Sequence, residues 1–389
     1  MRGRWALRML HPTTVLTFAI FWSTLDRSLI LPLVPTIARD LGATVPGAAT
    51  AITLQALAYS LLQILWGPLS TRWGRVRVLW LSTAIAAAAN VGSALAPDLT
   101  WFLIARTASG GAFAATFAAV LTYFGDTLPL ERRPAAMSNL ATATALALGF
   151  GTLVSGAIVT AVSWRSIFGG FAVVTIAMAW AISRLPDAAD RHEERVLVQL
   201  RLLLRNRWGL GVCALVAVEG LLLIGVYNLL PVALQQEGED VFVSGLVTSV
   251  FGVAVVVVSQ VMKSVITRIP PAAFIAVGGA CAVAAFTVLA TGVSPVAVLV
   301  GAGLMGTSWA LAHTTLQTWM TDAAAATRAL GMTLFSISLM LGGAAGAALG
   351  SVAVGLDAFP TLFVASIAVS SGFAIAGTIS RARYTVRGG

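Results

Sequence analysis

Twelve apolar runs, each long enough to cross a lipid bilayer, dominate this sequence of 389 residues. A helix needs about 20 residues to cross a hydrocarbon core of roughly 30 Å. The runs lie approximately at 13–38, 48–70, 77–96, 99–123, 136–161, 166–184, 208–233, 242–264, 272–291, 295–320, 330–354 and 359–380. A lipid-spanning barrel would instead need segments of about ten residues with alternating polarity, and the sequence lacks that pattern. The chain is therefore predicted to be an all-α membrane protein with twelve transmembrane helices.

The composition agrees with a membrane protein. Hydrophobic residues make up 58% of the chain and charged residues 10%, whereas soluble domains are about 25% charged. The arginines near the N-terminus precede an apolar run that is too long for a signal peptide, so we expect a retained first helix. Both cysteines, Cys213 and Cys281, fall inside predicted spans, so no disulfide framework is expected.

The placement of the basic residues predicts the orientation. With the N-terminus in the cytoplasm, twenty of the 24 lysines and arginines fall in cytoplasmic loops and tails, and only Arg39 and Arg165 fall on the other side. This asymmetry is the positive-inside signal. It explains the net charge of +9 through contact with anionic lipid, so no nucleic-acid partner is expected. We expect a bacterial-type inner (cytoplasmic) membrane protein with both termini in the cytoplasm.

Residues of the first half recur in the second half at a constant shift of 196 positions. The recurring pairs are Pro35 and Pro231, Arg72 and Arg268, Gly110 and Gly306, Asp126 and Asp322, and Arg132 and Arg328. The alternative is chance recurrence among the few residue types of an apolar sequence. The shift favours two six-helix pseudo-symmetric bundles of the same orientation, as in parallel repeats. The predicted division is 1–184, a cytoplasmic linker at 185–207, and 208–389.

Four ionisable residues lie deep in the apolar spans, namely Asp26, Arg27, Arg106 and Glu219. A charge at that depth costs roughly 2.5–3.5 kcal/mol on insertion scales. The four charges sum to zero, which favours paired groups. Glu219 lies three residues before Leu222, the position that corresponds to Asp26, and so lies on nearly the same helix face.

This arrangement suggests a proton relay made of Asp26, Arg106 and Glu219. A carboxylate in an apolar cavity binds a proton more readily than in water, and a nearby arginine opposes this. If both carboxylates line one cavity, a rocking motion would let them load and release protons. The alternatives are a fixed ion pair between Asp26 and Arg106, and for Glu219 a structural role or contact with a cationic substrate. Arg27 is expected either to pair locally or to bind an anionic substrate group.

Large or polar residues within the spans are candidates to bind substrate. They are Trp22, Arg27, Gln55, Tyr59, Tyr227, Asn228, Trp309, His313 and Gln317. Many aromatic rings with few hydrogen-bonding groups suit a bulky amphipathic ligand better than a sugar. His313 is either a proton carrier or a hydrogen-bonded structural residue.

The loop after the second span, Gly67-Pro-Leu-Ser-Thr-Arg-Trp-Gly-Arg-Val-Arg77, resembles the G-x-L-a-D-r-x-G-r-k loop of the major facilitator superfamily. Its glycines suit a tight turn. The resemblance implies a gating loop that contains Gly67, Arg72, Gly74, Arg75 and Arg77. Thr71 replaces the family aspartate that is thought to latch the outward-open state, so the latch is expected to be weaker or differently built. The alternative is a basic loop that serves topology alone.

The resemblance to the superfamily covers nearly the whole chain, and three further motifs resemble its drug exporters. They are Arg106-Thr-Ala-Ser-Gly110, Gly151-Thr-Leu-Val-Ser-Gly156 and Trp164-Arg165-Ser-Ile-Phe168. The first implies that Arg106 takes part in proton handling. The second carries Thr152 where the antiporter motif has proline. Small residues also let helices approach closely, so packing alone is an alternative explanation of the glycines.

We therefore expect a proton-coupled secondary transporter that exports amphipathic small molecules and acts as a monomer. Its expected partners are the substrate, protons and membrane lipid, with no enzyme activity, cofactor or metal. In the linker, we expect 187–194 to be solvated and 196–207 to lie on the inner leaflet as an amphipathic segment. The alternatives are an importer or uniporter of a small metabolite, and a non-transporting sensor or scaffold.

Overall fold

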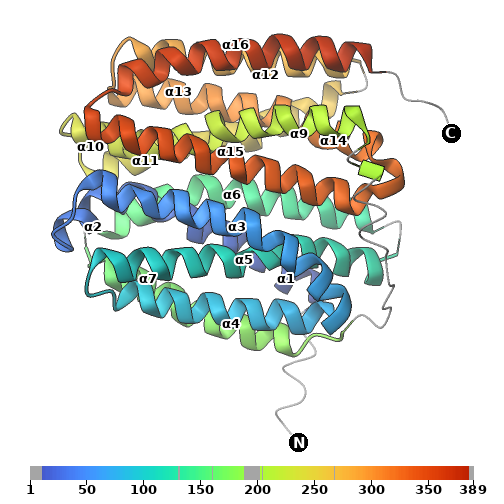
Figure 1. Ribbon diagram of the computed structural model, residues 1–389, viewed down its shortest axis with the longest axis horizontal. Coiled ribbons are helices and arrows are strands. Elements are labelled where there is room, and N and C mark those ends of the chain that lie inside the picture. Colours follow the sequence, from blue (N-terminus) through green and yellow to red (C-terminus); the bar gives the residue numbers. More distant parts are fainter. Residues whose placement is uncertain are drawn as a thin grey trace, which may run out of the picture.

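A computed structural model describes residues 11–129, 132–159, 161–187, 202–203, 205–266 and 268–384. Within this part of the chain, twelve helical segments are long and apolar enough to cross a membrane, and there is no strand. They lie side by side along the long axis of the molecule (Figure 1). The prediction of a twelve-helix, all-α membrane fold is confirmed.

The spanning segments of the first half overlap the predicted runs. They are α1 (Pro12–Ser28) continued by η3 (Leu31–Leu33) and α2 (Val34–Asp40), then α3 (Val45–Trp73), α4 (Arg75–Ala94), α5 (Leu99–Thr127), α6 (Arg133–Val159) and α7 (Trp164–Ser183).

The spanning segments of the second half have three interruptions. They are α9 (Arg207–Gly220) continued by η4 (Leu221–Val226), η5 (Tyr227–Leu229) and α10 (Leu230–Gln236), then α11 (Val241–Val265), α12 (Pro271–Ala290), α13 (Pro295–Ser308) continued by η6 (Trp309–His313) and α14 (Thr314–Ala323), then η7 (Ala325–Thr327), α15 (Arg328–Leu356) and α16 (Phe359–Arg383).

The shift of 196 residues holds for whole helices as well as for single residues. Helices α2 and α4 begin and end 196 positions before α10 and α12, and the short turn η3 has the same relation to η5. The breaks in the first and seventh spans coincide because proline, at Pro35 and Pro231, has no backbone N–H to continue the helical hydrogen bonds. The two halves thus have the same local architecture at the same positions.

Two π-helical turns break this equivalence, and both belong to the second half. They are η4, directly after α9, and η6, between α13 and α14. The positions that correspond to η6, 113–117, are α-helical within α5. Single π-turns inside α-helices occur frequently at functional sites.

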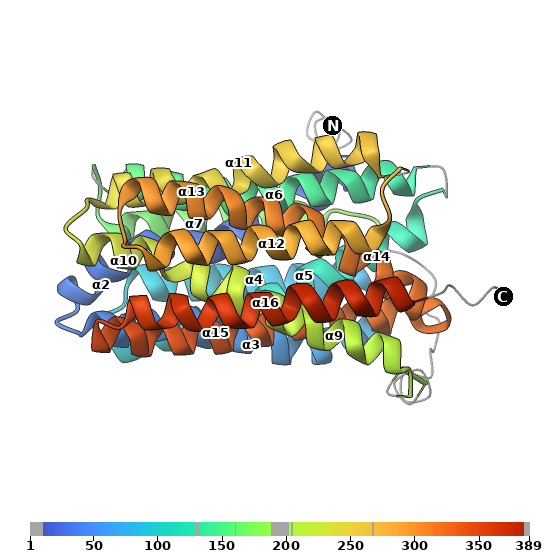
Figure 2. The ribbon, with the colours of Figure 1, turned by 90° about the horizontal axis from the view of Figure 1, so that it is seen from above.

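The two halves lie on opposite sides of the molecule and meet through α3, α6, α11 and α15 (Figures 1 and 2). Contacts between them gather at the end that carries α2 and α10. There Gln235 Nε2 donates a hydrogen bond to the carbonyl oxygen of Pro32 at 3.0 Å. A Cβ atom on Gly156 of α6 would lie 2.8 Å from the carbonyl oxygen of Val241 at the start of α11. The halves are therefore in direct contact at this end.

Close packing of α15 against α9 and η4 positions the seventh span. A Cβ atom on Gly342 would overlap the carbonyl oxygen of Ala217, and one on Gly346 would overlap that of Leu221. The two glycines are four residues apart, the spacing that lets membrane helices approach backbone to backbone. This contact fixes the helix turn that contains Glu219.

Candidate functional site

The polar centre of the first half is built around Asp26 of α1, which is fully buried. Its Oδ2 atom lies 2.6 Å from Arg106 Nη2. The same oxygen accepts hydrogen bonds from Gln55 Nε2 and Ser109 Oγ, each at 2.9 Å. Three donors from α3 and α5 therefore hold the carboxylate of α1.

Arg106 extends this centre to two further helices. Its Nη1 atom donates to Asn90 Oδ1 of α4 at 3.1 Å, and its guanidinium carbon lies 4.8 Å from the ring centre of Phe168 of α7. The arginine side chain is fully buried. A buried ion pair is tolerated when both charges are matched and hydrogen-bonded. Here the charges match and both terminal nitrogens of Arg106 have partners, whereas its Nε atom has none among the described residues.

Gly110 explains how Gln55 comes to lie near Asp26. A Cβ atom on Gly110 would overlap the backbone carbonyl oxygen of Gln55, so only glycine allows α5 to approach α3 this closely. Gly110 is one helical turn after Arg106. The glycine of the predicted R-x-x-x-G motif therefore has a packing role that serves the polar centre.

The polar centre of the second half is the pair Glu219 and His313. The Glu219 side chain is fully buried, and its Oε2 atom lies 2.8 Å from His313 Nδ1 of η6. The Oε1 atom has no hydrogen-bond partner among the described residues. The His313 ring stacks on Trp309 at 4.0 Å between ring centres and meets the edge of Phe335 at 5.2 Å. Glu219 is thus held by a single titratable partner.

Arg27 lies at the contact between the halves. Its guanidinium carbon is 4.4 Å from the ring centre of Tyr59, and its Nη1 atom is 3.3 Å from Met340 Sδ of α15. Its Nη2 atom lies 3.5 Å from Thr24 Oγ1. Within the described part of the chain, no carboxylate lies within ion-pair distance of it. The cation is half-buried and has soft, uncharged neighbours.

The other predicted substrate residues do not all share one surface. Trp22 stacks on Phe171 at 4.0 Å between ring centres and donates its indole N–H to Thr175 Oγ1. Tyr227 is buried and donates its hydroxyl to the carbonyl oxygen of Thr248 at 2.9 Å. Asn228 and Gln317 are half-buried.

The structure thus groups the predicted residues into separate clusters. Gln55 joins Asp26, Tyr59 joins Arg27, and Trp309 joins the pair of Glu219 and His313. No hydrogen bond or ion pair links Asp26 with Glu219 among the described residues.

Several residues in these clusters were not among the predicted site residues, including Ser109, Asn90, Phe335 and Met340. Ser109 lies one turn after Arg106, and Asn90 is a lone amide within an apolar span, so each could have been recognised from the sequence as a partner of Arg106 or Asp26. Phe335 and Met340 are apolar residues in an apolar helix and had none.

The predicted gating loop folds as a sharp junction between α3 and α4. Gly74 has a φ of 100°, a conformation that favours glycine. Arg75 is buried and its Nε atom lies 3.2 Å from Asp126 Oδ2. Arg72 and Arg77 are exposed, Gly67 lies half-buried within α3, and the Thr71 side chain is outside those described.

Asp187 of the linker contacts this junction. Its Oδ1 atom accepts a hydrogen bond from the backbone N–H of Val76 at 3.2 Å, in the first turn of α4. An acidic group there is favourable because a helix N-terminus carries partial positive charge. The linker thus supplies a carboxylate next to the loop whose own motif aspartate is replaced by Thr71. Residues 188–201 lie outside the described residues.

The Trp164-Arg165 motif ties three segments together at the end of the bundle that carries α2. Trp164 Nε1 donates to Asp40 Oδ2 at 3.0 Å, and Arg165 pairs with the same carboxylate. Arg165 Nη2 also donates to the carbonyl oxygen of Ala96. The motif holds the start of α7 against the ends of α2 and α4. Among the described residues no group of three or more His, Cys, Asp or Glu side chains could hold a metal ion.

Comparison with known proteins identifies relatives of this chain. The family model of the Major Facilitator Superfamily matches residues 16–347. A stretch of 259 residues, 64% of this chain, is 28% identical to 60% of the multidrug resistance protein MdtM of Escherichia coli O157:H7. A stretch of 188 residues, 47% of this chain, is 28% identical to 32% of an MFS-type transporter of Claviceps purpurea.

Both matches cover less than two thirds of the relative's own length. Among solved structures, the D323A mutant of the nucleoside transporter NupG superposes with a TM-score of 0.75 at 12% identity, over 95% of this chain and 100% of that one. At this identity the superposition shows a shared fold.

Proposed function

This chain belongs to the Major Facilitator Superfamily, and from that premise we propose that it exports amphipathic small molecules in exchange for protons. Its family and fold are those of membrane transporters rather than enzymes. The coupling to protons, the direction of transport and the substrate class are the content of the proposal.

The observation that carries the proposal is a buried carboxylate near the middle of one span in each half. Asp26 lies near the middle of the 29-residue span Pro12–Asp40, and Glu219 near the middle of the 30-residue span Arg207–Gln236. Acidic residues at bilayer depth are costly and typically mark proton relays or substrate sites. Each of these has a partner on another helix that a relative movement can withdraw, namely Arg106 and His313.

Proton coupling follows because the contacts of each buried carboxylate with its basic partner change during transport. When Arg106 contacts Asp26, the ionised carboxylate is stabilised and the proton is released. When a movement of α1 relative to α5 within the first half separates them, the carboxylate in its apolar surroundings takes up a proton. Glu219 goes through the same cycle as His313 approaches and leaves it, because a carboxylate in apolar surroundings binds a proton more readily than in water.

Two observations support export of amphipathic molecules. The surroundings of the second-half centre are aromatic, with Trp309 and Phe335 against His313, and flat apolar ligands stack well on such rings. The similar MdtM protein is named a multidrug resistance protein. Arg27, which has no carboxylate partner in the described part, is then a contact for an anionic substrate group.

We place the transporter in the inner (cytoplasmic) membrane with both termini in the cytoplasm, because the basic residues gather on that side. Residues 1–184 and 208–389 would move as two units joined by 185–207, with the chain acting as a monomer. The contacts at the α2 and α10 end, such as Gln235 to Pro32, would break in the outward-open state.

Substrate-driven proton flux in proteoliposomes tests the proposal. The protein is reconstituted with a pH-sensitive dye inside the vesicles, and a panel of cationic, anionic and neutral amphipathic dyes is added. In the wild type, dye movement should accompany proton movement in the opposite direction. Asp26→Asn and Glu219→Gln should each abolish this coupling, because the amide cannot carry the proton.

Asp40→Asn is the matched control. It removes the acid of another aspartate–arginine pair, but that pair lies at the end of its span and is partly exposed. Coupling should survive in this variant. Wild-type coupling in both Asp26→Asn and Glu219→Gln would overturn the relay, and dye flux that ignores the pH gradient would favour a uniporter.

A further inference from the structure

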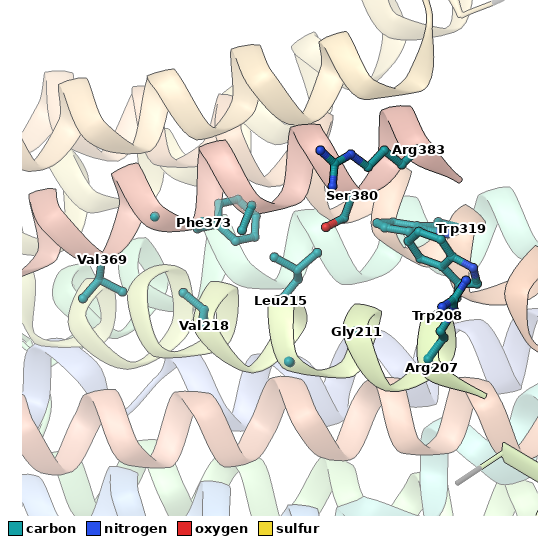
Figure 3. A pocket seen from close by; sticks show the side chains of 13 residues that line it. Arg207, Trp208, Gly211, Leu215, Val218, Trp319, Val369, Phe373, Ser380 and Arg383 are labelled. Atoms are coloured by element: carbon teal, nitrogen blue, oxygen red, sulfur yellow. The ribbon is translucent and has the colours of Figure 1, made fainter. Parts of the chain in front are cut away.

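A groove of about 880 Å³ lies between α9, α14 and α16, away from both polar centres. None of the nine residues predicted to bind substrate lines it. Its walls are mostly apolar, with Leu215 and Val218 of α9 facing Val369 and Phe373 of α16 (Figure 3). No residue of the Asp26–Arg106 pair or of the Glu219–His313 pair lines it, so the groove is distinct from both polar centres.

Small residues on the groove walls leave its interior open. Gly211 on α9 and Gly372 on α16 both line it, and a Cβ atom on either would meet nothing within 4 Å. Neither glycine serves a close helix contact, unlike Gly342 or Gly346. The space is thus large enough to accept atoms from outside the chain.

One end of the groove is cationic. Arg207, the first residue of α9, and Arg383, the last residue of α16, lie at the end that also holds Trp208 and Trp319 (Figure 3). In the described part of the chain neither arginine pairs with a carboxylate. The buried indole N–H of Trp319 likewise has no acceptor there. This end therefore offers two arginine side chains that lack a carboxylate partner in the described part of the chain.

The length of the groove matches one leaflet. From Arg207 to Val218, α9 rises about 16 Å at 1.5 Å per residue, which is about half of a hydrocarbon core of roughly 30 Å. The arginines therefore lie at head-group depth and the apolar walls at acyl-chain depth. Tryptophans at the same level are typical of the membrane interface.

We propose that this groove binds one anionic phospholipid of the adjoining leaflet. Its phosphate would lie between Arg207 and Arg383, and an acyl chain would run along Leu215, Val218 and Phe373. Basic pockets between transmembrane helices recognise anionic head groups in this way. Such a lipid would join the start of α9 to the end of α16, and α9 also carries Glu219.

Lipid titration of the purified full-length protein tests this proposal. Dioleoyl-phosphatidylglycerol or dioleoyl-phosphatidylcholine is added in detergent, and bound lipid is counted by native mass spectrometry. The wild type should bind the anionic lipid more tightly. Replacing both arginines (Arg207→Gln with Arg383→Gln) should weaken that binding about thirty-fold, or about five-fold for each arginine, and leave the neutral lipid unaffected.

Two controls separate charge from shape. Arg268→Gln removes an exposed arginine that does not line the groove and should change nothing. Gly372→Leu should fill the groove and weaken both lipids, whereas Gly170→Leu, at a position on α7 with equal free space, should not. Equal binding of the two lipids, or wild-type binding in the double arginine variant or in Gly372→Leu, would overturn the proposal.

Discussion

The two halves use the same helical scaffold for different polar centres. In the first half, Asp26 of α1 is bound by Arg106 and Ser109 of α5 and by Gln55 of α3, all within α-helices. In the second half, Glu219 has one side-chain partner among the described residues, His313, which belongs to the π-turn η6, and Glu219 itself lies two residues before the π-turn η4. The His313 side chain keeps 13% of its surface exposed, whereas that of Arg106 keeps 0%.

This difference indicates a division of roles on a duplicated frame. Arginine stays protonated at any physiological pH, so the first-half pair is a charge lock that opens only when the helices move. The second-half pair joins an imidazole to a carboxylate, so it is an ion pair only when His313 is protonated. Because Glu219 Oε1 has no partner in the described part, the second centre also has room for a further donor from substrate or water.

The largest effect is expected from breaking the first-half lock. Arg106→Met leaves the fully buried Asp26 without a cation, and removing one partner of a buried pair costs about 3–5 kcal/mol. The apparent melting temperature of the purified protein should fall strongly. Asp26→Asn combined with Arg106→Gln should recover most of it, because neutral amides can keep the hydrogen bonds to Gln55 and Asn90.

The double variant also separates the two interpretations of this pair. If it recovers both stability and proton coupling, the pair is only a structural link between α1 and α5. If it recovers stability alone, the charges serve transport. An unchanged melting temperature in Arg106→Met itself would contradict the lock.

A smaller effect is expected from the corresponding change in the second half. Glu219→Gln keeps a side chain that can hydrogen-bond to His313, so the cost should be about 0.5–1.5 kcal/mol. The melting temperature should change much less than in Arg106→Met, although proton coupling should be lost. A fall as large as that of Arg106→Met would mean that Glu219 and His313 also form a fixed charge pair, and the contrast between the halves would disappear.

The fold was predictable from the sequence because each span is a separate apolar run of bilayer length. The duplication was predictable too. Prolines at helix breaks, such as Pro35 and Pro231, and glycines at close helix contacts must keep the same positions in both halves. The embedded charges stood out because charge is rare at that depth.

The partners of those charges were harder to predict because they depend on how helices approach in three dimensions. His313 is 94 residues from Glu219, and their contact depends on helix packing within the second half, where Gly342 and Gly346 fix α15 against α9. The π-turns depend on a single extra residue in a helical turn, which changes no hydropathy pattern. Asp187 is exposed, and no local sequence pattern predicts its contact with Val76.

The smallest effect on stability, and the finest test of the contrast, is expected at Arg27, where the halves touch. A cation over an aromatic ring contributes about 0.5–1 kcal/mol at a partly exposed site, and no acidic partner is left unpaired within the described residues. Arg27→Gln should therefore lower the free energy of unfolding by less than about 1 kcal/mol.

In transport assays of the Arg27→Gln variant, the KM for anionic amphipathic dyes should rise, whereas the KM for cationic dyes should stay the same. Tyr59→Phe keeps the ring beneath the guanidinium and should leave both values unchanged. If Arg27→Gln shifts the KM of both dye classes equally, Arg27 acts through the contact with Met340 between the halves rather than through the substrate.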